Sequence, residues 1–153
     1  TPPGYQAILD AEIPRVALDG GAGEVRVMAG TFAQATGAAR TFSPMQVLDL
    51  HLKAGHKVSL PVQEGWNTAL VLLDGEIRVA DEDAAGPAQL VVLSREGDAL
   101  ALEARTDVKA LLLSGQPLNE PIVGHGPIVM NTQQEIRQAI TDFNSGKFGR
   151  MTR

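Results

Sequence analysis

Hydrophobic and polar residues alternate with a period of two in several stretches of the chain. Segments 24–29 and 45–54 show this most clearly, and in the second of them Leu48, Leu50 and Leu52 share one face. Successive side chains of a strand point to opposite faces of its sheet, so a period of two indicates a strand with one buried face. Both segments are therefore predicted to be half-buried β-strands.

Further short strands are predicted at regular spacing, over 57–62, 68–73, 76–80, 89–93, 99–102 and 108–113. About eight short strands separated by turns every 8–12 residues are typical of a sandwich or barrel. Asp74-Gly75 stands between two of them and predicts a tight hairpin, because both turn residues must take positive φ. Pro61 cannot donate to a β-ladder, so its strand is predicted to lie at a sheet edge or bend.

The two ends of the chain follow other patterns. Residues 1–20 are an expected extended lead-in, and their Thr-Pro-Pro-Gly opening suggests a linker within a longer protein. Residues 21–115 carry the strands, and 116–153 form an expected extended segment and helix. The helix is predicted by a capping box over 132–135 and by an apolar stripe of Ile136, Ala139, Ile140 and Phe143. That stripe is expected to pack either on the outer face of the barrel or on a further domain.

Composition narrows the function classes. The net charge is −5, with 13 Lys and Arg scattered along the chain, so no basic patch for nucleic acid is expected. The chain has no cysteine, which excludes disulfides, thiolate metal sites and a cysteine nucleophile. Its apolar runs are far shorter than the ~20 residues that span a bilayer. A cytoplasmic protein with no nucleic-acid or membrane partner is therefore expected.

Two motifs resemble a known family. The run 70–79, LVLLDGEIRV, resembles the central strands of cupins, and the tail 119–132, NEPIVGHGPIVMNT, resembles the C-terminal signature of the pirin family. Residues 135–140 and 146–149 are similar to that family's closing helix and end. Residues 3–6, PGYQ, resemble its linker between two cupin domains, so the resemblance covers essentially the whole chain.

The resemblance implies a fold and a function. It implies an all-β, cupin-type jelly-roll barrel of about eight strands with one C-terminal α-helix. Pirins pair two such barrels, and their N-terminal barrel holds Fe(II) or a similar divalent metal through three histidines and a glutamate. Bacterial members resemble quercetin 2,3-dioxygenases, and eukaryotic members are linked to transcription co-regulation. If the chain begins at the linker, its own N-terminal cupin would be its partner, and Glu120, His125 and Asn131 are candidate interdomain contacts.

A cupin metal site needs two histidines two residues apart on one inward face. The corresponding positions fall near Leu60 to Val62 and are apolar or proline, and the later histidine, expected between Gly97 and Leu113, is missing. Glu64 has no histidine near it, and His51, His56 and His125 are dispersed. We therefore expect no metal ligand set, no cofactor and no catalytic residue in this chain. Trp66 is a candidate for the barrel mouth, with rim or core packing as the alternative.

Three functions remain open at this point. The chain is best interpreted as the non-metal-binding C-terminal cupin of a pirin-like protein, supporting a metal-dependent N-terminal cupin that lies outside it. It could instead be a protein-interaction module of the co-regulator type, or a metal-free small-molecule binder. Self-association is also expected if an apolar face is left uncovered.

Overall fold

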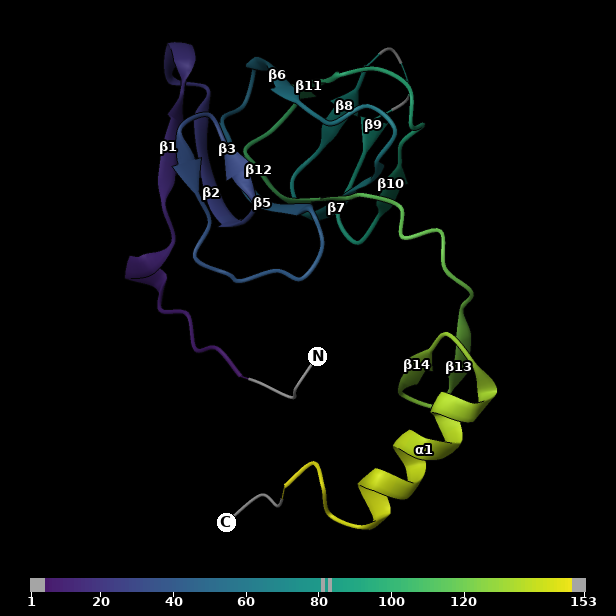
Figure 1. The fold of residues 1–153 in the computed structure, drawn as a ribbon. Coiled ribbons are helices and arrows are strands. Elements are labelled where there is room, and N and C mark those ends of the chain that lie inside the picture. The colour runs from purple at the N-terminus through teal and green to yellow at the C-terminus, as the bar shows by residue number, and fades with distance from the viewer. Residues whose placement is uncertain (1–4, 81, 83, 150–153) are drawn as a thin grey trace. The chain divides into compact units, whose positions relative to one another are not determined.

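The computed structural model describes residues 5–80, 82 and 84–149, and these form two compact units. One unit runs from Gln6 to Pro117 and contains two facing β-sheets. The other contains the C-terminal residues from Leu118 onwards and holds a short hairpin and a helix. Figure 1 shows the elements of both units. The chain is mostly β with one α-helix in its described part, as the sequence predicts.

The larger sheet has six strands in the order β1-β2-β5-β12-β7-β10, all antiparallel. In chain order these are β1 (Arg15–Leu18), β2 (Gly23–Ala29), β5 (Met45–Leu52), β7 (Asn67–Asp74), β10 (Leu90–Val92) and β12 (Val108–Gly115). The predicted strands over 24–29 and 45–54 are confirmed, and the side chains of Val25, Leu48 and Leu50 are fully buried. Strand β1 arises from the segment that the sequence marks only as a lead-in.

The smaller sheet has four strands in the order β6-β11-β8-β9. They are β6 (Lys57–Pro61), β8 (Ile77–Val79), β9 (Ala84–Ala85) and β11 (Ala99–Ala104). Pro61 lies on β6 at the sheet edge, where its missing N–H costs no central hydrogen bond. The unit also contains a small hairpin of two-residue strands, β3 (Thr31–Phe32) and β4 (Ala35–Thr36). Two 3₁₀ turns complete it, η1 (Asp10–Glu12) and η2 (Asp19–Gly21).

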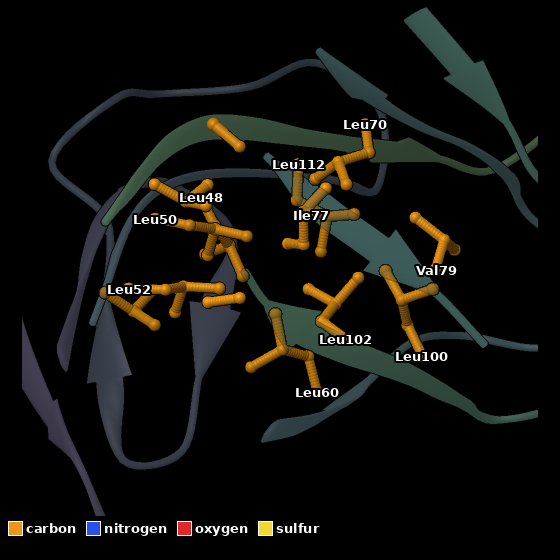
Figure 2. Packing of buried hydrophobic residues seen from close by; sticks show 14 of the residues in the cluster. Leu48, Leu50, Leu52, Leu60, Leu70, Ile77, Val79, Leu100, Leu102 and Leu112 are labelled. Carbon is orange, nitrogen blue, oxygen red and sulfur yellow. The ribbon is translucent and has the colours of Figure 1, made fainter. Parts of the chain in front are cut away.

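Leucine side chains fill the space between the two sheets (Figure 2). Leu48, Leu70 and Leu112 project from the larger sheet, while Leu60 and Leu102 project from the smaller one, and each is at most 2% exposed. Fully burying one such side chain contributes roughly 1.5–3 kcal/mol relative to leaving it exposed. The inward-facing side chains of the strands therefore supply the buried apolar surface that mainly stabilises this unit.

The prediction of a hairpin at Asp74-Gly75 is wrong. Strand β7 pairs with β12 and β10, whereas β8 pairs with β11 and β9, so the chain crosses here from one sheet to the other. Gly75 has a φ of +82°, and a Cβ placed on it would lie 2.1 Å from the carbonyl oxygen of Asp107. Glycine is required by this close approach to the β11–β12 turn.

The C-terminal unit contains β13 (Val123–His125), β14 (Ile128–Met130) and α1 (Gln133–Asn144). The two strands pair in a short hairpin within a segment that the sequence analysis expected to be extended. Thr132 caps α1 by accepting the N–H of Glu135, and its hydroxyl donates to Glu135 Oε2, so the predicted helix start is confirmed. The helix packs on β13 and β14 and buries Ile136 and Ala139. No helix in the described ranges is long and apolar enough to cross a membrane.

Adjacent residues of β7 provide a test of the core. Leu72 is fully buried and Leu73 is 52% exposed. We expect Leu72→Ala to lower the free energy of unfolding by about 2–5 kcal/mol, because it removes buried methyl groups and leaves a cavity. Leu73→Ala, the matched control, should cost less than about 1 kcal/mol. Urea unfolding measures both values, and equal losses would contradict the assignment of inward and outward faces.

Candidate functional site

Apolar side chains occupy the inward positions at which a cupin metal site would need its paired histidines. Leu60 is 1% exposed, and its partner across the β6–β11 ladder is Leu100. Val62 follows two residues later and packs against the core. Paired imidazoles would have to project from this same face to share one ion. The side chains present carry no atom that can ligate a metal, so these positions do not fit a metal site of the cupin kind.

The histidines and Glu64 lie apart. His51 is on the outer face of β5, with its Nε2 3.1 Å from Asp49 Oδ1. His56 follows β5 in a turn, and its Nδ1 is 3.2 Å from the carbonyl oxygen of Ala54. Glu64 is exposed in the turn before β7, and His125 is exposed on β13 of the other unit. No three His, Asp or Glu side chains are grouped to hold a metal within the described part of the chain.

Charged side chains cover one part of the outer face of the larger sheet. Arg26 on β2 binds Asp49 on β5 at 2.7 Å, and Asp49 is only 8% exposed. Arg26 also binds Asp10, which in turn accepts from Arg15 at 3.2 Å. The sequence analysis did not identify this network because it links strands that are distant in sequence.

An apolar patch lies on the same outer face. Leu113 lies between Val47 and Ala69 across three strands, and Leu111 lies beside Val71. Exposed side chains extend it on both sides, with Val92 73% and Leu90 60% exposed. We call this set the outer patch, and its members are Met45, Val47, Ala69, Val71, Leu90, Val92, Leu111 and Leu113. Contiguous exposed apolar surface of this kind makes the outer patch a candidate interaction face.

A row of polar side chains replaces leucine at one end of the inner face. Gln46, Ser114 and Thr68 are neighbours across β5, β12 and β7. The buried hydroxyls of Thr68 and Ser114 are 2.8 Å apart, and the amide of Gln46 donates to the carbonyl oxygen of Thr31 at 2.6 Å. This row was not predicted from the sequence, although each member lies two residues from an inward-facing leucine on its own strand. We call this end of the unit the mouth.

Trp66 lies at the mouth, partly buried, and lines two neighbouring pockets of about 490 and 440 Å³. The larger pocket is also lined by Thr68 and by apolar side chains of both sheets. The smaller one adjoins Phe32 and Gln46. Both pockets are lined by polar as well as apolar side chains, and their volumes lie within the range of small-molecule sites.

The exposed Asp107 and the half-buried Asp142 both accept hydrogen bonds that favour the carboxylate. Asp107 accepts the N–H of Ala54 at 2.9 Å and pairs with Lys53 at 3.1 Å, and these contacts lower its pKa. Asp142 near the end of α1 has its pKa lowered by hydrogen bonds from Lys147 and Gln138. Neither group has the raised pKa expected of a general acid.

The C-terminal unit places the predicted interdomain residues on or beside its hairpin. Asn131 donates to Glu120 Oε2 and to the carbonyl oxygen of Pro121, both at 2.9 Å. These bonds join the two ends of the hairpin segment. His125 is exposed at the hairpin turn. Glu120 and Asn131 therefore have a local structural role, and the interdomain role of all three remains a prediction.

Known proteins share this sequence and fold. The family model described as the Pirin C-terminal cupin domain matches residues 47–149. A Pseudomonas aeruginosa protein named "Putative quercetin 2,3-dioxygenase" is 49% identical over 96% of this chain and 51% of its own length. Pirin of Mus musculus is 38% identical over 96% of this chain and 51% of its own length.

A solved structure agrees with these relatives. The crystal structure of quercetin 2,3-dioxygenase from Acinetobacter baumannii has a TM-score of 0.92 and 50% identity to this chain. The match covers 99% of this chain and 53% of that one. The chain thus spans about half the length of these relatives, and the predicted resemblance is confirmed.

The hydroxyl pair at the mouth gives a second test. Thr68→Val removes one hydroxyl and leaves Ser114 Oγ buried without its partner, which should cost about 1–3 kcal/mol of unfolding free energy. Ser114→Ala should cost a similar amount. The double variant should lose less than the sum of the two single losses, because no unpaired hydroxyl remains. Additive losses in urea unfolding would show that the two hydroxyls are not coupled.

The Asp107 contacts give a pH test. Because they favour the carboxylate, its stabilisation is present above the ordinary unfolded pKa of about 3.9 and is lost as pH falls through the lower folded pKa. A carboxyl NMR titration should give Asp107 a midpoint below about 3.9, and Lys53→Met should raise it part of the way, because the Ala54 N–H remains. A midpoint at the ordinary value would contradict these contacts.

Proposed function

Because the chain belongs to the pirin family, as its C-terminal cupin domain, we propose that it is the non-metal-binding half of a two-cupin protein. In this proposal a metal-dependent cupin outside this sequence carries quercetin 2,3-dioxygenase-like chemistry. The present domain supports and orients that cupin. The observation that carries the proposal is the apolar interior, where Leu60, Val62 and Leu100 occupy the inward face.

The outer patch supports a docking role. It is an apolar area spread over neighbouring strands of the larger sheet, and its exposed members include Val92 and Leu90. The ion pair of Arg26 with the nearly buried Asp49 borders it on the same face. An apolar centre beside fixed charges is the usual composition of a protein interface. We assign the preceding cupin as its occupant, because the relatives are about twice as long as this chain.

The C-terminal unit supports the same role. Its helix buries only Ile136 and Ala139, while Phe143 is 66% and Val129 64% exposed. So small a core cannot stabilise an independent domain. Exposed apolar side chains of this kind indicate that the C-terminal unit packs on a larger surface. We propose that this surface is also the preceding cupin.

A chimera tests the proposal. The part of the Acinetobacter baumannii enzyme that matches this chain, at 50% identity, is replaced by residues 1–153. We expect the chimera to fold, to bind its metal and to turn over quercetin, because this domain supplies support and not ligands. A folded chimera that lacks metal and activity would contradict the proposal.

Charge insertion locates the docking face. Leu113→Glu in the chimera should lower activity at least about tenfold, since an unpaired carboxylate would be buried in the interface. Ser59→Glu is the matched control, because it adds the same charge on an exposed position of β6 in the other sheet. Equal activities of the two variants would remove the outer patch as the docking face.

A further inference from the structure

The larger mouth pocket, of about 490 Å³, is bounded by both sheets. Val91 contributes from β10 and Leu100 from β11, while Leu93 and Val62 contribute from the residues just after β10 and β6. The remaining lining includes the polar side chains of Gln63, Glu82, Arg95 and Glu96. Val79 and Leu100 of the hydrophobic core also line the pocket, so it reaches the edge of that core. This volume suits a ligand of one or two rings.

An aromatic and a basic side chain give the pocket its chemistry. Trp66 is partly buried and lines the pocket, which leaves ring surface available to an apolar planar group. Arg95 is exposed at the rim, and its Nε donates to Asn67 Oδ1 at 2.8 Å. Among the described residues, no carboxylate lies within 4.0 Å of the Arg95 guanidinium. Guanidinium groups match carboxylates in shape and charge.

Hydrogen bonds between the two rim loops hold these side chains in place. The N–H of Gly65 donates to the carbonyl oxygen of Arg95 at 2.7 Å, and the N–H of Val62 donates to that of Asp98 at 2.9 Å. Together with the Arg95 to Asn67 bond, they tie the loop before β7 to the loop before β11. A rim fixed in advance reduces the ordering cost of binding.

We propose that this pocket binds a small planar aromatic carboxylate without a metal. The ring system lies against Trp66 and the apolar walls, and the carboxylate pairs with Arg95. The pocket shares Val92 with the outer patch. Its test reads ligand binding in this chain and not activity of the chimera, so failure of this proposal can be told from failure of the docking role. No bond is made or broken, so the domain would act here as a binding or sensing module.

The tryptophan itself reports the outcome. Trp66 is the single tryptophan of the chain, so its indole N–H gives one identifiable cross-peak in a ¹⁵N NMR spectrum. The 153-residue chain is titrated with 2-naphthoate in the presence of EDTA. We expect a saturable shift of that cross-peak, with further shifts at Val91 and Leu100. Cyclohexanecarboxylate, which has the charge without the aromatic plane, should bind at least about fivefold more weakly.

Variants separate the two contacts. Arg95→Gln should weaken 2-naphthoate about tenfold in calorimetry, because a charge-assisted bond is lost, and should leave 2-naphthamide within about twofold. Arg105→Gln is the matched control, since it removes the same charge from an exposed arginine paired with Glu103. Trp66→Leu should weaken the binding of both 2-naphthoate and 2-naphthamide.

Two results overturn the proposal. One is a Trp66 cross-peak that does not move up to the solubility limit of 2-naphthoate in the wild-type chain, which needs no variant to fold. The other is binding that Arg95→Gln and Arg105→Gln reduce equally, because the carboxylate would then have no specific partner at the rim.

Discussion

Packing of leucine side chains between the two sheets is the interaction on which the rest of the structure depends. It fixes which side of each strand faces inward, and thereby which side chains can reach the interior at all. In this chain the inward side chains of β6 and β11 are apolar, and they include the paired Leu60 and Leu100. The same packing that stabilises the domain thus fills the inward positions at which metal ligands were sought in the sequence.

The outer surfaces differ from one another in chemistry. The larger sheet carries the outer patch and, beside it, the ion pair of Arg26 with Asp49. The C-terminal unit leaves Phe143 and Val129 exposed above a core of two side chains. Both features are costly for an isolated domain and useful for one that packs on a partner. The mouth instead holds polar side chains and a pocket lined by Trp66, which meets the outer patch at Val92.

Local pattern predicted the strands and their faces, because burial follows the period of two. It placed Val25 and Leu50 inward and His51 outward, and the capping box placed the start of α1. It failed at Asp74-Gly75, where the turn chemistry is right for a hairpin but β7 pairs with β12, about 40 residues further along the chain. Strand order depends on packing between distant segments, which a local motif does not contain. The row of Gln46, Ser114 and Thr68 was missed for the same reason, since the register alone brings them together.

The central claim is that this domain carries no metal of its own, and iron content tests it most directly. The 153-residue chain is incubated anaerobically with Fe(II), desalted and assayed for iron per chain. The account predicts a value near zero, because the inward side chains of β6 and β11 carry no ligand atoms. About one iron per chain, lost on substitution of His51, His56, Glu64 or His125, would contradict it and place a metal site outside the inner face.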